Sequence, residues 1–180
     1  MDDILLLTKA MNFAAQKHTS QRRKGEAAEP YINHPIEVAT ELAINGAPLN
    51  AIVAALIHDT VEDTGTSEEE IVREFGQNIA DIVNEVSDDK TLPKAVRKQL
   101  QIEHAAHASA EAKQLKMGDK ISNLRAILTS PPAGWEVKEK LEYFNWAKKV
   151  VDNCRGVNAG LEASFDEVYK RGIKAFKPAA

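Results

Sequence analysis

Apolar residues recur every three or four positions along most of the chain, and no segment shows the strict apolar–polar alternation of a half-buried strand. Near the start, for example, Ile4, Leu7, Met11 and Ala14 recur at helical spacing. Proline and glycine separate these periodic stretches and mark the ends of successive helices. The sequence therefore predicts an all-α fold, in which the helices form a bundle.

Residues that favour helix ends give the approximate boundaries. Pro35 suits the first turn of a helix, and Ser67 with Glu70 forms a capping box. Loops are predicted at 21–33 and 129–134, where the periodicity breaks. We predict one helix from about residue 50 into the His58-Asp59 pair, and others at about 2–18, 35–46, 67–76, 78–86, 93–107, 110–128, 136–154 and 159–171.

The composition is typical of a soluble globular protein, with 43% hydrophobic and 28% charged residues. The length of 180 residues fits a single domain spanning 1–180. The 23 basic and 27 acidic side chains give a net charge of −4, so no global basic field favours nucleic acid. A polyanionic ligand therefore needs a local basic patch. The charged residues Lys94, Arg97, Lys98 and Glu103 are expected to form a solvated helix face.

Cysteine content and hydropathy indicate the compartment. Cys154 is the only cysteine, which excludes an intrachain disulfide and fits a reducing environment. The first residues lack the positive region and the long apolar core of a secretory signal. No apolar run approaches the roughly 20 residues that span a bilayer. We therefore expect a cytoplasmic protein with no membrane partner.

The segment around His58 and Asp59 carries the strongest chemical signal. An apolar run leads into this pair, and Glu62 and Asp63 follow within one helical turn. Residues three and four apart share a helical face, so Glu62 lies beside both His58 and Asp59. Moving several ionisable groups toward an apolar interior is costly unless a metal or another ion compensates. The spacing therefore points to a metal-dependent hydrolase.

His34 and Asp119 extend this set. His34 precedes a proline at the opening of a helix, and Asp119 lies within a periodic apolar pattern. Two histidines and two aspartates form a mixed nitrogen and oxygen donor set suited to Mn²⁺, Fe²⁺ or Zn²⁺. The residues alone leave other roles open: His34 as a helix cap, Asp119 paired with a nearby lysine, and the two later acids as solvated groups. His18, His104 and His107 are expected to be ordinary surface or core histidines.

Several segments together have the order and spacing of a known family. They are Arg23-Lys24 through Tyr31-Ile-Asn-His34-Pro35, then His58-Asp59-Thr-Val-Glu62-Asp63-Thr, then Asp119-Lys120 through Asn123-Leu-Arg125. On these segments the chain resembles the HD-domain phosphohydrolases, and within them the hydrolase domain of RelA/SpoT-type alarmone enzymes. The segments at 88–94 and 142–147 look most like the stand-alone small alarmone hydrolases related to the metazoan SpoT homologue. The resemblance covers about residues 4–172 and implies a single HD-domain helical bundle.

The resemblance also implies roles for individual residues. It makes four residues the ligands of one metal ion, usually Mn²⁺: His34, His58, Asp59 and Asp119. Glu62 and Asp63 become the pair that positions and deprotonates the attacking water. Four further residues would contact the nucleotide substrate, the first two through its phosphates and the others through the nucleoside: Arg23, Lys24, Asn123 and Tyr143. Gly118 departs from the family pattern, in which alanine often precedes the ligand aspartate. Glycine is expected to lower the stability of this helix by about 1 kcal/mol relative to alanine.

The activity implied by the resemblance is hydrolysis of (p)ppGpp at its 3′-pyrophosphate, giving GDP or GTP and pyrophosphate. A second hypothesis is NADPH 2′-phosphatase or another nucleotide phosphohydrolase activity, because NADPH also carries a phosphate on a secondary ribose hydroxyl. A third is a non-enzymatic, metal-bound nucleotide sensor, which is disfavoured because every ligand and both acids are present. The sequence leaves the oligomeric state open.

Overall fold

The computed structural model describes residues 2–177. Within this range the chain forms nine α-helices and no strand, and two isolated β-bridges are its only extended pairings. The helices are α1 (Asp3–Lys17), α2 (Asn33–Ile44), α3 (Leu49–Thr64), α4 (Glu68–Phe75), α5 (Gln77–Val86), α6 (Lys94–Ala105), α7 (Ala110–Thr129), α8 (Val137–Asp152) and α9 (Ala159–Phe176). The all-α prediction is confirmed.

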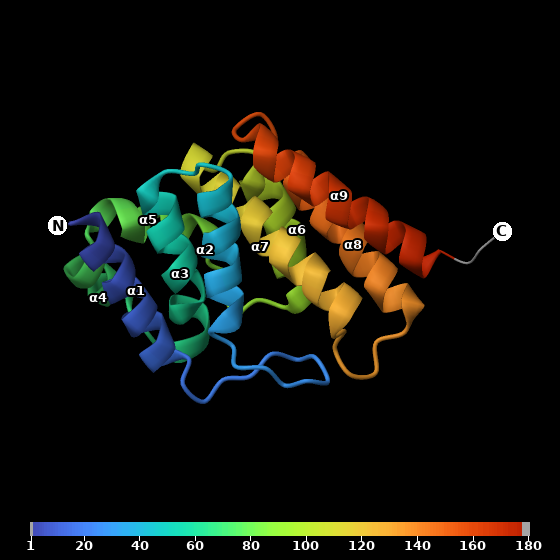
Figure 1. The fold of residues 1–180 in the computed structure, drawn as a ribbon, viewed down its shortest axis with the longest axis horizontal. Coiled ribbons are helices and arrows are strands. Elements are labelled where there is room, and N and C mark those ends of the chain that lie inside the picture. Colours follow the sequence, from blue (N-terminus) through green and yellow to red (C-terminus); the bar gives the residue numbers. More distant parts are fainter. Residues whose placement is uncertain (1, 178–180) are drawn as a thin grey trace.

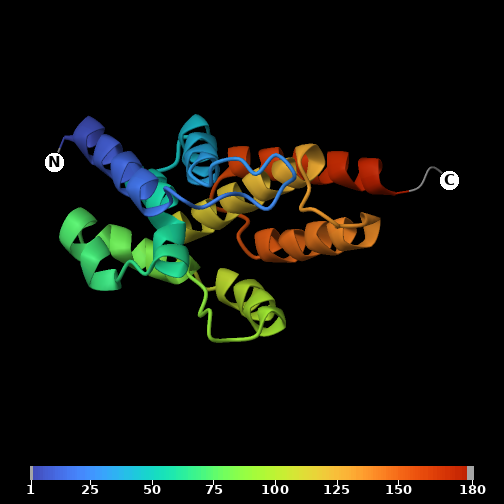
Figure 2. The same ribbon diagram turned by 90° about the horizontal axis from the view of Figure 1, so that it is seen from below.

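Helices α3 and α7 lie at the centre of the bundle. Helix α3 packs against α1, α2, α5 and α7, and α7 also packs against α2, α5, α8 and α9. Figures 1 and 2 show α8 and α9 side by side at one end of the molecule, with α1 and α4 at the other. Residues of α2, α3 and α7 are therefore brought close together although they are far apart in the sequence.

The apolar sequence of α3 fits this central position. Val53, Ala54, Ala55 and Ile57 are all fully buried. A helix that is apolar on all sides is stable only inside a protein, where neighbouring helices cover every face. His58 continues this helix, so it emerges among other buried side chains and not in solvent.

The loop between α1 and α2 reaches across to the loop between α7 and α8, as Figures 1 and 2 show. Gly25 forms an isolated bridge with Pro132. A Cβ on Gly25 would lie 2.4 Å from Oγ and 2.5 Å from the backbone oxygen of Ser130, so only glycine permits this approach. The contact fixes the segment that carries Arg23 and Lys24.

Some predicted boundaries were wrong. Helix α3 continues beyond the His58-Asp59 pair to Thr64. Helix α9 continues past Arg171 to Phe176, because the ring of Phe176 packs on Phe144 of α8, with the ring centroids 5.5 Å apart. The prediction of one domain over 1–180 stays a prediction, and its first residue and last three lie outside the described residues. Among the residues described, no helix is both long enough and apolar enough to cross a membrane.

Candidate active site

Three packed helices contribute the four predicted metal ligands. His34 lies in the first turn of α2, His58 and Asp59 lie in α3, and Asp119 lies midway along α7. The Nε2 atom of His34 is 3.1 Å from Oδ1 of Asp119 and 3.6 Å from Oδ2 of Asp59. The same Asp59 oxygen is 3.2 Å from Nε2 of His58. The structure thus brings His34 and Asp119 together although they are 85 residues apart in the sequence.

The spacing of these donor atoms fits a single cation. Ligand atoms of His34, His58 and Asp59 all lie within 4.8 Å of one another. Nδ1 of His58 lies 2.8 Å from the carbonyl oxygen of Ala55, which can only accept, so this nitrogen carries the proton. Nε2 of His58 is then a bare lone pair, buried and without a hydrogen-bond partner. A buried, unpartnered imidazole nitrogen beside carboxylates is the arrangement that a bound metal satisfies.

Asp119 also has partners within the protein. Its Oδ2 atom lies 2.7 Å from Nζ of Lys120, and its Oδ1 atom accepts a 2.7 Å hydrogen bond from Nδ2 of Asn123. Burial would raise the pKa of Asp119, but the charge of Lys120 outweighs it and the pKa falls well below the usual range. The pairing with a lysine that the sequence left open therefore exists, but Lys120 is buried and not on a solvated face.

The two predicted catalytic acids have different surroundings. Glu62 accepts a 2.6 Å hydrogen bond from the backbone N–H of Asp88, and burial raises its pKa above the ordinary value. Burial also acts to raise the pKa of Asp63, but hydrogen bonds from Lys90 and Gln21, at 2.9 Å each, outweigh it and lower the pKa. Neither acid is a freely solvated group.

All ten predicted site residues line one or the other of two adjoining cavities, of about 420 and 190 Å³. Six residues line both cavities and form their shared boundary: Tyr31, His34, Asp59, Glu62, Asn123 and Tyr143. The larger cavity also has a basic border, formed by the side chains of Arg22, Arg23, Lys24, Lys90 and Lys94. A chain with a net charge of −4 therefore has the local cationic patch that a polyanion requires.

The four predicted substrate residues lie around these cavities. Nη2 of Arg23 donates to Oδ1 of Asn123 at 3.3 Å, and Nη1 is 3.3 Å from Oε2 of Glu37. Lys24 lines the larger cavity, next to Arg23 in the loop between α1 and α2. Tyr143 of α8 lines both cavities, and burial raises its pKa to about 12. It therefore stays a neutral hydrogen-bond donor near neutral pH.

Several residues at the site had no role in the sequence-based prediction. The hydroxyl of Tyr31 donates to Oδ2 of Asp59 at 2.6 Å, and Lys90 lies 3.2 Å from Glu62 and 2.9 Å from Asp63. His18, expected to be either a surface or a core histidine, is buried, and its Nδ1 atom lies 2.7 Å from Oε1 of Gln21. Tyr31 and Lys90 stand within segments that carry the family resemblance, which is the one signal that could have selected them.

The expectation of a solvated charged face on α6 was wrong for two residues. Nζ of Lys98 lies 4.7 Å from the centroid of the Trp146 ring, and Nη1 of Arg97 lies 3.5 Å from Oδ2 of Asp88. Lys120 approaches the same Trp146 ring at 4.5 Å. Trp146 therefore packs between cationic side chains next to the smaller cavity.

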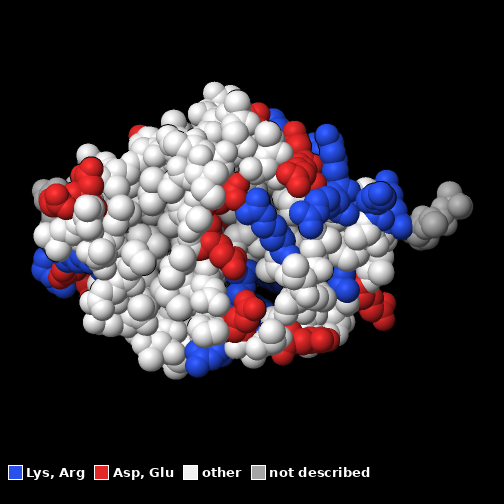
Figure 3. Space-filling model, viewed as in Figure 1, with Lys and Arg blue, Asp and Glu red and all other residues white. Residues whose placement is uncertain are grey.

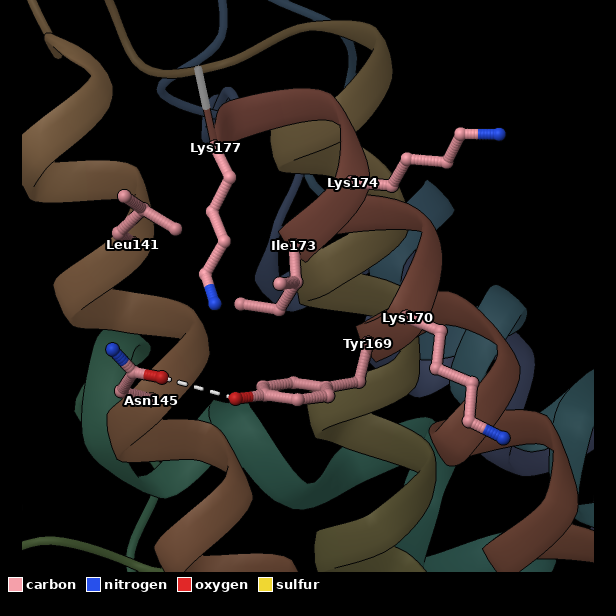
Figure 4. Close-up of a pocket in the computed structure, with 7 residues that line it drawn as sticks. All are labelled: Leu141, Asn145, Tyr169, Lys170, Ile173, Lys174 and Lys177. Carbon is pink, nitrogen blue, oxygen red and sulfur yellow. Dashed lines mark hydrogen bonds between the residues drawn. The ribbon is translucent and has the colours of Figure 1, made fainter. Parts of the chain in front are cut away.

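A larger cavity lies elsewhere. It has about 830 Å³ and opens between α8 and α9, where Lys177 extends between Leu141 and Ile173, whereas Lys170 and Lys174 point away from α8 (Figure 4). Lys and Arg side chains gather over this end of the molecule in Figure 3, whereas the half over α2 and α3 is mostly uncharged. No histidine, aspartate or glutamate lines this cavity, so it lacks the groups that bind a metal or activate water.

Comparisons with known proteins agree with this geometry. The model of the HD domain family matches residues 10–142. A Xenopus tropicalis protein named guanosine-3′,5′-bis(diphosphate) 3′-pyrophosphohydrolase MESH1 is 50% identical over 169 residues, covering 93% of this chain and 94% of the relative. The human protein of the same name is 46% identical over 170 residues, covering 93% and 95%.

Solved structures show the same similarity. A metazoan ortholog of SpoT that hydrolyses ppGpp and plays a role in starvation responses superposes with a TM-score of 0.88 at 45% identity, covering 92% of this chain and 94% of the other. A crystal structure from Listeria monocytogenes superposes with a TM-score of 0.65 at 29% identity, covering 79% and 98%. With a matching family model over most of its length and close relatives along nearly all of it, this chain belongs to the HD domain family.

Proposed function

We propose that this protein is a Mn²⁺-dependent hydrolase of (p)ppGpp, which it cleaves at the 3′-pyrophosphate to give GDP or GTP and pyrophosphate. The observation that carries this proposal is the cluster of His34, His58, Asp59 and Asp119 beside a cavity with a basic border. The similarity to proteins named for this reaction, at 46–50% identity along nearly their whole length, supports the same substrate.

The four clustered side chains would hold one divalent metal per chain. Two imidazoles and two carboxylates, with no thiolate nearby, suit Mn²⁺ and are also compatible with other divalent transition metals. Such an ion, when bound, polarises a phosphoryl oxygen and lowers the pKa of a coordinated water. The unpartnered Nε2 of His58 supports this assignment, because it otherwise remains a buried polar atom without a partner.

Glu62 would accept the proton of the attacking water, and Asp63 would help to orient that water. A general base works best when its pKa approaches the working pH, and burial raises the pKa of Glu62 in that direction. The pKa of Asp63 shifts the opposite way, because Lys90 and Gln21 donate to both of its oxygens. Two neighbouring carboxylates whose pKa values are pushed apart suit different roles.

Arg23 and Lys24 would bind the substrate phosphates, and Asn123 and Tyr143 would hold the nucleoside. A guanidinium can form two parallel hydrogen bonds to a phosphate, whereas the lysine acts as a point charge. Arg23 now contacts Glu37 and Asn123 at 3.3 Å each, distances at the long end for a charged pair. These contacts are weak enough for a phosphate to compete for the guanidinium.

The function is tested by comparing substrates on one preparation. Metal-stripped protein is incubated with ppGpp, pppGpp or NADPH, with and without added Mn²⁺, and the products are separated by ion-exchange chromatography. We expect Mn²⁺-dependent release of GDP from ppGpp and of GTP from pppGpp, each with pyrophosphate. Faster release of inorganic phosphate from NADPH would replace this proposal with the phosphatase hypothesis. Nucleotide binding without any product would favour the sensor.

A further inference from the structure

A chain of hydrogen bonds connects two predicted metal ligands through the arginine that faces the substrate. It passes through six side chains, in the order His34, Ser122, Glu37, Arg23, Asn123 and Asp119, and at its ends Nε2 of His34 lies 3.1 Å from Oδ1 of Asp119. Ser122 and Glu37 are the two members of this chain that are neither predicted metal ligands nor predicted substrate residues. Neither residue has a role in the proposed function so far.

Chemistry determines the direction of the two hydrogen bonds that Ser122 forms. Oγ of Ser122 lies 2.7 Å from Oε2 of Glu37 and 3.0 Å from Nδ1 of His34. An ionised carboxylate can only accept, so the single hydroxyl proton of Ser122 goes to Glu37. Toward His34 the hydroxyl oxygen can then only accept, and Nδ1 of His34 must carry a proton. Nε2 of His34 is left as a bare lone pair that faces Asp59 and Asp119.

We propose that Ser122 and Glu37 are positioning residues, which fix the tautomer and the ring orientation of His34 for metal binding. This inference rests on the assignment of His34 as a metal ligand in the proposed function. Ser122 is nearly fully buried in α7, so water does not compete strongly for its hydroxyl. Glu37 lies one turn after His34 on α2, where residues three apart share a face. His58 obtains the same tautomer from the carbonyl of Ala55.

Variants of Glu37 separate this role from a merely structural one. Glu37→Leu removes the acceptor, so the Ser122 hydroxyl becomes free to donate to Nδ1 of His34 and to stabilise the wrong tautomer. Glu37→Gln keeps an oxygen that accepts from Ser122, so it should preserve the tautomer. Ser122→Ala leaves Nδ1 of His34 without a partner. Glu167→Leu is the matched control, because Glu167 is an exposed glutamate on α9, 73% exposed at its side chain.

Two measurements test the proposal, and neither depends on activity. Nitrogen-15 NMR of the histidine rings in metal-free protein, assigned with His34→Gln, reports which nitrogen of His34 carries the proton. Calorimetric titration reports the affinity for Mn²⁺. In Glu37→Leu and Ser122→Ala we expect a mixture of His34 tautomers and an affinity lower by about 10- to 100-fold, the usual effect of losing a partner behind a metal ligand. Glu37→Gln and Glu167→Leu should match the unaltered protein.

The outcomes distinguish this inference from the proposed function. If the unaltered protein binds no Mn²⁺, or if His34→Gln binds it normally, the metal assignment fails and the positioning role fails with it. If Mn²⁺ binds through His34 but Glu37→Leu and Ser122→Ala keep both the affinity and the single tautomer, the positioning role is wrong and the proposed function stands. Equal losses in Glu37→Gln and Glu37→Leu would also overturn it, because the accepting oxygen would then be irrelevant.

Discussion

The hydroxyl of Tyr31 donates a 2.6 Å hydrogen bond to Oδ2 of Asp59, the oxygen that lies 3.2 Å from Nε2 of His58 and 3.6 Å from Nε2 of His34. Burial and this negative neighbour raise the pKa of Tyr31, so its hydroxyl keeps its proton. Tyr31 therefore donates permanently to a carboxylate at the centre of the metal-binding cluster. A donor in this position orients the carboxylate and offsets part of its charge.

We expect Tyr31→Phe to weaken Mn²⁺ binding by about 10- to 100-fold while leaving the fold intact, because the change removes only the oxygen that orients Asp59. The measurement is a calorimetric Mn²⁺ titration. Tyr169→Phe is a matched control, since that hydroxyl donates to Asn145 at 3.0 Å beside the distant cavity of Figure 4. Unchanged affinity in Tyr31→Phe would show that Asp59 needs no such donor.

Glu62→Gln should lower kcat by about 10²- to 10⁴-fold, the usual contribution of a general base, because an amide cannot accept the proton of the water. The Mn²⁺ affinity and the KM for ppGpp should change little, since Glu62 is proposed neither as a metal ligand nor as a phosphate contact. Steady-state kinetics on metal-loaded protein separate these quantities. Glu68→Gln on the exposed start of α4 is the control. A normal kcat in Glu62→Gln would remove Glu62 from the catalytic role.

Gly118→Ala should destabilise the protein although alanine favours a helix by about 1 kcal/mol. A Cβ at this position would lie 2.3 Å from Cδ1 of Leu42 and 3.2 Å from Cγ1 of Val38, both fully buried in α2. We expect overpacking of about 1–3 kcal/mol to exceed the helical gain. Urea unfolding of Gly118→Ala, of Leu42→Val and of the double variant gives the coupling free energy between the two positions. Because valine lacks the clashing Cδ1, the double variant should lose less than the sum of the single losses, and simple additivity would contradict this account.

Glu41 should contribute an acid-sensitive part of the stability. Burial acts to raise the pKa of Glu41, but hydrogen bonds from Arg125, Ser164 and Asn45 outweigh it and lower the pKa below 4.5. A lowered folded-state pKa means that the stabilisation is complete above about pH 4.5 and is lost as the pH falls through the folded-state value.

We therefore expect Glu41→Gln to lower the free energy of unfolding by about 1 kcal/mol at pH 7. The loss is modest because Arg125, the partner of Glu41, is half exposed and solvent weakens the ion pair. The deficit should shrink as the pH falls below 4.5, where the native carboxyl becomes protonated too. Urea unfolding from pH 7 to pH 3 measures it, with Glu167→Gln as the control for an exposed charge. A deficit that stays constant with pH would show that ionisation of Glu41 is irrelevant.

Much of the fold was predictable because it depends on local patterns. The spacing of apolar residues predicts the helices. Ser67 accepts the backbone hydrogen bond from Glu70, which is one half of the predicted capping box, but the Glu70 carboxylate pairs with Lys17 at 3.0 Å. The end of α9 was not predictable in this way, because the packing of Phe176 on Phe144 extends the helix. Gly118 shows the same limit: the sequence indicates only weaker helix propensity, whereas the structure shows that α2 and α7 could not approach so closely with a larger residue.

The candidate site likewise contains residues that the sequence predicted and residues that it missed. The sequence predicted ten residues, and all of them line the two adjoining cavities, although their roles stay predictions. The residues it missed act on partners distant in sequence: Tyr31 on Asp59, Gln21 on Asp63, and Ser122 on His34. No spacing rule relates such pairs, since helix packing and not helix periodicity brings them together.

The most direct test of the account is a titration of metal-stripped protein with Mn²⁺, in which GDP and pyrophosphate released from ppGpp are both quantified. We predict no turnover without metal, a linear rise that saturates at one Mn²⁺ per chain, equal amounts of GDP and pyrophosphate, and no turnover in Asp59→Ala at any Mn²⁺ concentration that saturates the unaltered protein. Turnover that persists without metal, or full activity in Asp59→Ala, would contradict the metal site. Release of inorganic phosphate in place of pyrophosphate would contradict the bond proposed to break.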